Sequence, residues 1–309
     1  MTGPQWTLDE IPDLTGKRAL VTGVTSGLGE HTVLELARKG CEVVMAARNA
    51  SKLDAAMTDV RRVLPTASLV PLVVDLADLG AVRRAAADIA ATGSLDILVN
   101  NAGVMATPQL RTVDGFELQF GTNHLGHFAL TGLLFPQLAA AEAGRVVTVS
   151  SLMHRFARTV PLDDPRADNT RYLKWSAYAQ SKLANLLFAF ELDRRSRAAG
   201  FHVTSMAAHP GYASTNLVNA GLGMNGGPDG AIAAGVTRLV GQSAAMGAQP
   251  TLMAATLPGL AGGSYTGPRA PGELRGRPTV VTPSRTARDE LLARRLWEFS
   301  EKATGVRFP

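Results

Sequence analysis

The stretch "RALVTGVTSGLGEHTVLELARKG", residues 18–40, predicts a strand, a glycine-rich loop and a helix in direct succession. Residues 18–23 form the short apolar run of a buried strand, and residues 28–39 carry a helical pattern that ends at Gly40. Between them, the glycines of residues 22–29 let the backbone turn tightly and approach a phosphate at the positive end of the helix. Glycine-rich turns are common, so this inference rests on the position of the loop between strand and helix.

The loop also excludes one class of nucleotide-binding protein. No Gly-Lys-Ser or Gly-Lys-Thr follows it, as the phosphate-binding loop of NTPases requires. Its spacing differs as well from the G-x-G-x-x-G of the usual dinucleotide fold. The pattern therefore indicates a nucleotide site of a different kind.

The alternation of strand and helix continues along the chain. Five more strands are predicted at residues 42–48, 69–76, 95–103, 144–151 and 201–211, with helical patterns between them. Near-continuous Val, Ile and Leu runs are typical of strands buried on both faces, so we expect a parallel sheet with helices on both sides. This is an α/β class, a doubly wound parallel sheet in a single domain over residues 1–309, with a core of about 15–270.

Three segments depart from the simple alternation. Residues 116–141 predict one long helix, bent near its glycines. Residues 212–230 are rich in Gly and Asn, and we expect a substrate lid over about 212–256. At about 285–303 a basic amphipathic C-terminal helix is predicted. We expect its Leu, Trp and Phe stripe to dock on its own fold or on a neighbouring subunit; a membrane-surface role is the alternative.

Composition narrows the function classes. The chain has 309 residues, 46% hydrophobic, with 31 Lys and Arg against 26 Asp and Glu. Its arginines are scattered and its aromatic content is 6%, which argues against a nucleic-acid partner. The single cysteine, Cys41, fits a reducing compartment, and no signal peptide or membrane span is visible. We expect a cytoplasmic protein, with homo-oligomerisation left open.

The stretch "SAYAQSKLAN", residues 176–185, places Tyr178 and Lys182 four positions apart, on one face of a predicted helix. A phenol with a pKa near 10 is a poor base at neutral pH, and a nearby cation lowers that pKa by roughly 1–3 units. The pair therefore predicts acid–base chemistry. A solvated helix face is the alternative.

Three motifs in order carry a family resemblance. They are T-G-x-x-x-G-x-G at residues 22–29, N-N-A-G at 100–103 and Y-x-x-x-K at 178–182. Together they resemble the short-chain dehydrogenase/reductase family, and "TNHLGHFALT" and "HPG" look most like its retinol-dehydrogenase-like branch. The resemblance runs from about residue 17 to 305. It implies a Rossmann-like fold and an oxidoreductase that interconverts an alcohol with an aldehyde or ketone by hydride transfer.

The resemblance also implies a catalytic set. Tyr178 matches the acid–base residue and Lys182 the adjacent lysine, which also binds the nicotinamide ribose. Ser151 matches the serine that hydrogen-bonds the substrate oxygen, and Asn123 the asparagine that holds a water in the proton relay. Ser150 is a rival to Ser151, but neighbouring residues on a strand point to opposite faces, so only one reaches the substrate.

Other polar residues of the 116–141 helix leave alternatives open. Asn123 would otherwise be a polar helix residue that hydrogen-bonds across to a strand. His124 and His127 share a helix face, which could suggest a metal. No cysteine or carboxylate accompanies them at ligand spacing, so we expect packing and hydrogen bonding, and no metal.

Cofactor choice is decided at the end of the second predicted strand. An NAD-preferring enzyme usually has an acid there, where this chain has Ala47, followed by Arg48. An arginine pairs with a 2′-phosphate, so NADP(H) is expected in preference to NAD(H). A solvated strand-end charge is the alternative for Arg48.

The resemblance places cofactor contacts along the chain. Asp75 and Leu76 would contact adenine, residues 101–103 the adenosine ribose, and the turn after the sixth strand the carboxamide. The full expected set is Gly23, Thr25, Ser26, Gly27, Leu28, Gly29, Arg48, Asp75, Leu76, Asn101, Ala102, Gly103, Tyr178, Lys182, Pro210, Gly211 and Thr215.

The leading hypothesis is an NADP(H)-dependent oxidoreductase for a small alcohol or carbonyl substrate. Sugar-nucleotide epimerases and dehydratases also use Y-x-x-x-K, but they usually have glycine where this chain has Ser26. A non-catalytic NADP(H)-binding sensor or scaffold is the other alternative, although its catalytic residues would be free to drift. Six apolar side chains favour a lipophilic substrate: Leu152, Met153, Phe156, Leu217, Leu222 and Met224.

Overall fold

The apolar runs of the chain form one eight-stranded sheet in the order β3-β2-β1-β4-β5-β6-β7-β8. The computed structural model describes residues 6–169, 171–212 and 242–309. Its strands are β1 (Arg18–Thr22), β2 (Glu42–Ala47), β3 (Leu69–Val73), β4 (Ile97–Asn100), β5 (Arg145–Val149), β6 (Thr204–Ala208), β7 (Tyr265–Pro268) and β8 (Pro278–Val280). All neighbours are parallel except β7 and β8. The predicted Rossmann-like doubly wound sheet is confirmed.

Two of these strands are absent from the sequence prediction. β7 reads "YTGP" and β8 reads "PTV", so each is short and carries proline, and β7 also carries glycine. These residues are depleted in strands, and proline is confined to positions such as the edge that β8 occupies. Pro268 and Pro278 pair at the end of this antiparallel ladder. Long-range pairing, rather than local propensity, forms this edge.

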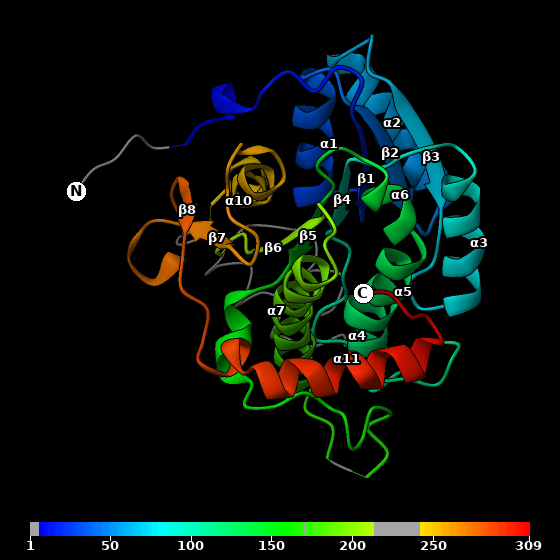
Figure 1. The fold of residues 1–309 in the computed structure, drawn as a ribbon, viewed down its shortest axis with the longest axis vertical. Helices are drawn as coiled ribbons and strands as arrows, with labels where there is room; N and C mark the ends of the chain where they lie inside the picture. The colour runs from blue at the N-terminus through cyan, green and yellow to red at the C-terminus, as the bar shows by residue number, and fades with distance from the viewer. Residues whose placement is uncertain (1–5, 170, 213–241) are drawn as a thin grey trace.

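Two helical layers cover the sheet, as Figure 1 shows. The pleat sends alternate residues to opposite sides: Ala19 and Val21 enter one core and Leu20 the other. The first core is closed by α1 (Leu28–Arg38), α2 (Ala50–Val63) and α10 (Ala244–Thr256). The second is closed by α3 (Leu79–Ala90), α5 (Gly126–Leu133), α6 (Phe135–Ala139) and α7 (Lys174–Ala198).

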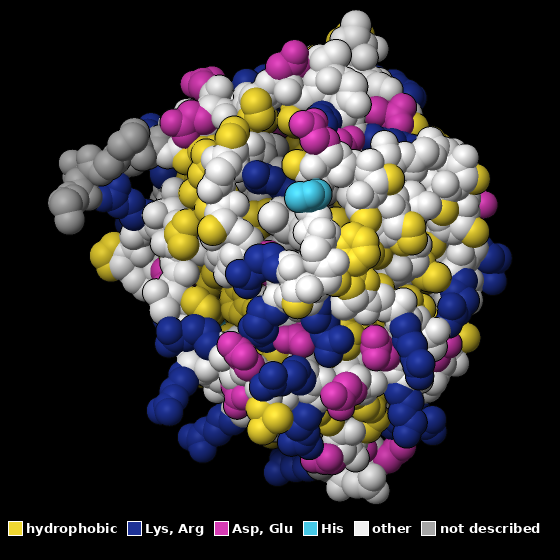
Figure 2. Space-filling model, in the orientation of Figure 1, with side chains coloured by type: hydrophobic (Ala, Val, Ile, Leu, Met, Phe, Trp, Pro, Cys, Tyr) yellow, Lys and Arg dark blue, Asp and Glu magenta, His cyan; other side chains and the backbone are white. Residues whose placement is uncertain are grey.

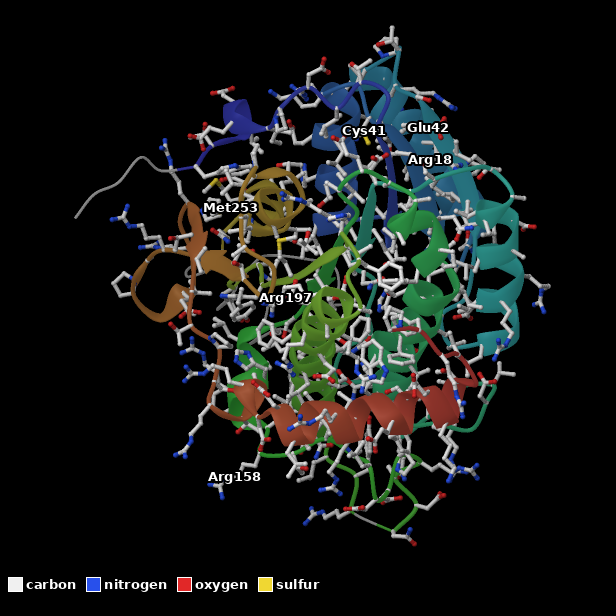
Figure 3. All side chains as sticks on the ribbon, in the orientation of Figure 1. Arg18, Cys41, Glu42, Arg158, Arg197 and Met253 are labelled. Atoms are coloured by element: carbon white, nitrogen blue, oxygen red, sulfur yellow. The ribbon has the colours of Figure 1, made fainter. Side chains whose placement is uncertain are left out.

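Helix α10 corrects the expected lid. The sequence predicts that residues 244–256 cover the substrate, but Ala248, Leu252 and Met253 are buried in the core beside α1 (Figure 3). An alanine- and methionine-rich helix that is apolar on most sides is typical of a buried element rather than a cover. Residues 213–241, with Thr215, Leu217, Leu222 and Met224, lie outside the described residues.

The predicted long helix over 116–141 is broken into pieces. It consists of α4 (Leu118–Phe120), a π-helical turn (Gly121–Leu125), α5 and α6. Gly126 allows a close approach, because a Cβ there would lie 2.3 Å from the Leu76 carbonyl oxygen. Single π-turns within helices occur frequently at functional sites, and this one carries Asn123.

The C-terminal helix α11 (Glu290–Thr304) docks on its own fold. Trp297 is 1% exposed, and its ring centre lies 5.0 Å from that of Phe128 on α5 and 5.9 Å from that of Phe188 on α7. Asp289 caps the first turn by accepting from the Leu292 amide, and Gly305 ends the helix in the left-handed conformation. The amphipathic stripe is therefore covered by the protein itself.

The surface around α11 carries both signs of charge. Figure 2 shows Lys and Arg side chains interspersed with Asp and Glu over this face, and Arg158 extends into solvent (Figure 3). Across the three described ranges, no helix combines the length and apolarity needed to cross a bilayer. The expected cytoplasmic location and the oligomeric state stay predictions.

Candidate active site

A cavity of about 250 Å³ opens at the carboxyl ends of β1, β2, β3 and β4. The strand order reverses between β1 and β4, and ligands of doubly wound sheets bind at such a switch point. The cavity brings together ten of the sequence-predicted cofactor residues: Gly23, Thr25, Ser26, Leu28, Arg48, Asp75, Leu76, Asn101, Ala102 and Gly103. The remaining lining comes from Thr22, Ala46, Ala47, Val74, Val104 and Thr122.

The glycines of the first loop form a tightly packed cradle, in which added side chains would collide with neighbouring backbone. A Cβ on Gly23 would lie 2.7 Å from the Cα of Ala102, and one on Gly29 would lie 2.2 Å from the Gly23 carbonyl oxygen. Gly23 and Gly27 have φ of 71° and 63°, which favours glycine. Gly27 caps α1 without a side-chain bond, so first-turn amides face the loop with no intrahelical acceptor. This cradle fits a phosphate.

The segment 101–103 is tied directly to this loop. The amides of Asn101 and Ala102 donate to the Thr22 hydroxyl at 3.0 and 2.9 Å, and Asn101 Nδ2 donates to the Thr22 carbonyl at 2.7 Å. The amide nitrogen of the Asn101 side chain is thus hydrogen-bonded within the protein. Its contribution to the cavity is to hold the floor in place.

At the end of β2, Ala47 is buried and Arg48 is exposed on the rim of the cavity. Among the described residues, no carboxylate lies within ion-pair distance of Arg48. The guanidinium is free to meet an anionic group entering the cavity.

Tyr178 and Lys182 lie in the first half of α7, and both are buried. The Lys182 ammonium nitrogen lies 5.8 Å from the centre of the Tyr178 ring and donates to the Val149 carbonyl oxygen at 3.1 Å. The tyrosine ring packs against Met105, Ala106 and Met153, an apolar wall beside the hydroxyl. The position of the pair is therefore set by the four-residue spacing on α7 and by the hydrogen bond from Lys182 to Val149 at the end of β5.

The pKa of Tyr178 corrects one expectation. Burial raises it to about 12, although the side-chain hydrogen bond with Ser151 opposes the rise. Burial also lowers the pKa of Lys182 to about 8. The expected lowering of the tyrosine pKa is therefore not found in this structure, where desolvation is the largest cause of the shift and the Lys182 ammonium group donates to the Val149 carbonyl. A neutral phenol is the form that donates a proton.

Of the two adjacent serines, only Ser151 reaches Tyr178. Its side chain hydrogen-bonds with the tyrosine and also accepts from the Met153 amide at 3.2 Å. The Ser150 hydroxyl instead donates to the Lys182 carbonyl oxygen at 2.8 Å, within the core. The alternation of the extended chain separates their roles.

Asn123 is fully buried, and its amide is engaged with backbone and side chain. Its Oδ1 accepts from the Val104 amide at 2.8 Å, while Nδ2 donates to the Val104 carbonyl at 2.9 Å and to Ser181 Oγ at 3.0 Å. These bonds reach the loop after β4 and helix α7, whereas the alternative interpretation expected a bond across to a strand. A Cβ on Gly103 would lie 3.1 Å from Asn123 Oδ1 and 3.5 Å from Lys182 Nζ, so all three meet at one point.

After β6, the turn at Pro210 and Gly211 is supported by residues that the sequence prediction missed. The Gly211 amide donates to His209 Nδ1 at 3.1 Å, and His209 Nε2 lies 3.0 Å from Glu273 Oε2. Arg155 donates to Glu273 Oε1 at 2.6 Å. Burial alone would raise the pKa of Glu273, but the bond from His209 and the neighbouring charges hold it below its usual value.

The sequence contains only part of the signal for this cluster of His209, Glu273 and Arg155. His209 belongs to "HPG", which entered the prediction for its proline and glycine alone, and Glu273 follows a Pro-Gly turn with no motif around it. The two lie 64 positions apart in the sequence, at 209 and 273, so only the folded chain joins them.

The two histidines of the π-turn region are buried and hydrogen-bonded. His124 Nε2 lies 2.8 Å from Ser300 Oγ on α11, and His127 contacts Thr22 and the Asn123 carbonyl. Burial lowers their pKa values to about 3 and about 4. Within the described ranges, no group of three or more potential metal ligands is found.

The fold and this arrangement of residues define an oxidoreductase of the nicotinamide-dependent class: a phosphate cradle at the switch point, with a buried Tyr and Lys and a half-buried Ser beside it. Comparison with known proteins agrees. Residues 17–161 match the family profile described as short chain dehydrogenase. Human retinol dehydrogenase 13 is 39% identical over 298 residues, covering 96% of this chain and 87% of the relative.

Solved structures show the same likeness. A crystal structure from Mycobacterium paratuberculosis is 43% identical, with a TM-score of 0.82 over 99% of this chain and 100% of that one. A short chain dehydrogenase from Burkholderia cenocepacia, in complex with NADP, is 26% identical, with a TM-score of 0.63 over 82% and 96%. The chain belongs to the short-chain dehydrogenase/reductase family. It is an oxidoreductase that acts on CH–OH groups or the matching carbonyls with NAD(P)(H).

Proposed function

We propose that the protein is an NADP(H)-dependent oxidoreductase that interconverts a lipophilic alcohol and its aldehyde or ketone. The observation that supports NADP(H) most directly is Arg48 on the rim of the cofactor cavity, next to a buried Ala47 and without an acidic partner among the described residues. A carboxylate at Ala47 would repel a 2′-phosphate, whereas a free guanidinium hydrogen-bonds with it.

The cofactor fits the residues present. The glycine cradle would hold the pyrophosphate, Arg48 the 2′-phosphate, and Asp75 and Leu76 the adenine end. The turn at Pro210 and Gly211 would meet the carboxamide. When bound, the nicotinamide supplies or accepts the hydride; the remaining steps belong to the side chains of this chain.

In the reducing direction, Ser151 donates a hydrogen bond to the substrate carbonyl oxygen and Tyr178 transfers its phenolic proton to that oxygen. The carbonyl carbon gains the hydride, so the product is the neutral alcohol and the phenol becomes phenolate. The Lys182 ammonium group, 5.8 Å from the centre of the Tyr178 ring, stabilises the phenolate by its charge, and the phenolate regains its proton from solvent before the next turnover. In the oxidising direction these steps reverse. Asn123 holds Val104 and Ser181 so that Lys182 and Gly103 keep their places.

A lipophilic substrate is supported by the wall around the phenol. Met105, Ala106 and Met153 pack on Tyr178. The human relative is named for retinol, which is an apolar alcohol. Apolar side chains around a few placed polar groups are usual in small-molecule sites.

The test is NADPH and NADH turnover, followed by coenzyme absorbance, with a panel of aromatic and aliphatic carbonyls and a matched panel of short polar ones. We expect faster reduction with NADPH and with the lipophilic members. Tight NADPH binding with no turnover for any substrate would favour the sensor or scaffold instead. Conversion of a nucleotide sugar with no net coenzyme oxidation would favour the epimerase.

A further inference from the structure

His127 occupies a position that fixes its tautomer. It is 1% exposed on α5, and its Nδ1 lies 2.9 Å from the Asn123 carbonyl oxygen, which can only accept. Nδ1 therefore carries the hydrogen, and in the neutral ring Nε2 is an acceptor. Nε2 lies 2.9 Å from the Thr22 hydroxyl, so that hydroxyl donates to it. A lowered pKa of about 4, caused first by burial, agrees with a neutral ring.

The Thr22 hydroxyl is then fully used. It donates to His127 at 2.9 Å, with the Val99 carbonyl oxygen as a longer second acceptor at 3.3 Å, and it accepts from the amides of Asn101 and Ala102, at 3.0 and 2.9 Å. A hydroxyl has one donor and two lone pairs, so no capacity is left. If His127 were also protonated at Nε2, the Thr22 oxygen would need a third lone pair to accept from it. One of the backbone amides of Asn101 and Ala102 would then lose its acceptor.

The other end of the same segment is held through Asn123. Its amide makes two bonds to Val104 and one to Ser181, and the Ser181 hydroxyl donates to the Tyr178 carbonyl at 2.8 Å. Thr22 therefore holds the start of residues 101–104, and Asn123 holds the end. His127 joins these two anchors, because its ring contacts both the Thr22 hydroxyl and the Asn123 carbonyl oxygen. Thr22 and His127 are 105 positions apart in the sequence.

We infer that His127 is a positioning residue, which sets the cofactor floor at residues 101–104 against the Asn123 π-turn and so against Tyr178 and Lys182. The inference rests on the proposed function, since it assigns a role within the same NADP(H) site. The two ring nitrogens of the imidazole have separate contacts. Nε2 accepts from Thr22, which holds the cofactor floor, and Nδ1 donates to Asn123 in the π-turn, which lies beside Tyr178 and Lys182.

Two substitutions separate these contacts. In His127→Asn the amide nitrogen takes the place of Nδ1, so the bond to Asn123 is kept and the bond from Thr22 is lost. In His127→Gln the amide oxygen takes the place of Nε2, so the reverse holds. Net hydrogen bonds change equilibria by about two- to tenfold. We expect His127→Asn to raise the Kd of NADPH by about three- to tenfold with little change in kcat at saturation, and His127→Gln to lower kcat by a similar factor with Kd near wild type.

His124→Asn is the matched control, because His124 is equally buried in the neighbouring helical turn but bonds to Ser300 on α11. It should lower Tm and leave Kd and kcat near wild type. Wild-type Kd and kcat in both His127 variants, or equal loss of both quantities in each, would reduce His127 to a packing role and overturn the inference.

A second pair applies where the His127 variants do not fold. Thr22→Val removes the shared hydroxyl and should weaken NADPH binding, and Thr22→Ser should restore it; wild-type Kd in Thr22→Val would overturn the inference. Kd is measured directly by titration of the full-length protein without substrate. Wild-type protein that binds no NADPH would instead overturn the proposed function, so the two failures are distinguishable.

Discussion

The ammonium group of Lys182 donates to the Val149 carbonyl at 3.1 Å while lying 5.8 Å from the centre of the Tyr178 ring. One of its three N–H donors is therefore bonded at the end of β5. Burial then dominates both groups, which raises the tyrosine pKa to about 12 and lowers the lysine pKa to about 8. The site holds a neutral phenol that is ready to donate.

Removing that donor tests the catalytic assignment. Tyr178→Phe keeps the ring against Met105 and Met153 but deletes the proton, and loss of a positioned general acid costs on the order of 10²–10⁴ in rate. We expect turnover to fall by that factor while the Kd of NADPH stays within a few-fold of wild type. Steady-state kinetics and cofactor titration decide the matter, and near-normal kcat would end the assignment.

The lysine makes a prediction about stability. Its folded pKa of about 8 lies below the ordinary 10.5, so between these values the unfolded chain binds more protons than the folded one. The free energy of unfolding should therefore rise as pH increases from about 8 to 10, by at most about 1.4 kcal/mol per unit from this group.

Lys182→Met should flatten that rise, because the titrating group is gone. Denaturant melts of both proteins across this pH window provide the measurement. Identical pH dependence in the two proteins would show that Lys182 is not the group responsible.

Arg48 should set cofactor preference. In the proposed complex its guanidinium would face the doubly charged 2′-phosphate of NADPH, and charge-assisted bonds contribute about 1.5–3 kcal/mol each, with exposure pulling the effect to the low end. Arg48→Ala should weaken NADPH by roughly 10–100-fold and leave NADH almost unchanged. Adding Ala47→Asp should reverse the preference. Equal loss for the two coenzymes, or wild-type preference for NADH, would contradict the assignment.

The Glu273 carboxylate links His209 behind the β6 turn to Arg155. Glu273→Gln removes the charge from both contacts, and we expect KM for the cofactor to rise by about three- to tenfold, the range of one or two net hydrogen bonds. Glu42→Gln is the control, since Glu42 pairs with Arg18 at 2.7 Å at the amino ends of β1 and β2 (Figure 3). An equal change in both variants would remove the special role of Glu273.

Trp297 should affect stability without touching chemistry. It is fully buried between α5, α7 and the segment that follows α11, with its ring 4.6 Å from that of Phe308. Trp297→Ala should cost about 3–5 kcal/mol of unfolding free energy, because a large cavity is left. Below its reduced Tm, kcat should match wild type. A small loss of stability would mean that α11 is not an integral part of the core.

Local pattern in the sequence was sufficient for some features. Apolar runs predict the first six strands, helical spacing stacks Tyr178 on Lys182, and the loop at residues 22–29 lies between β1 and α1 as expected. These features depend on neighbours only a few positions apart, and local sterics and hydrophobic periodicity determine them.

Tertiary structure decided what depends on distant contacts. It formed β7 and β8 from proline-containing runs, drew α10 into the core and bent the helix into a π-turn at Asn123. It also buried Tyr178 and Lys182, so that desolvation is the largest cause of the raised pKa of Tyr178. The reason is physical: desolvation and hydrogen-bond direction depend on which remote groups surround a side chain, and spacing along the chain does not contain that information.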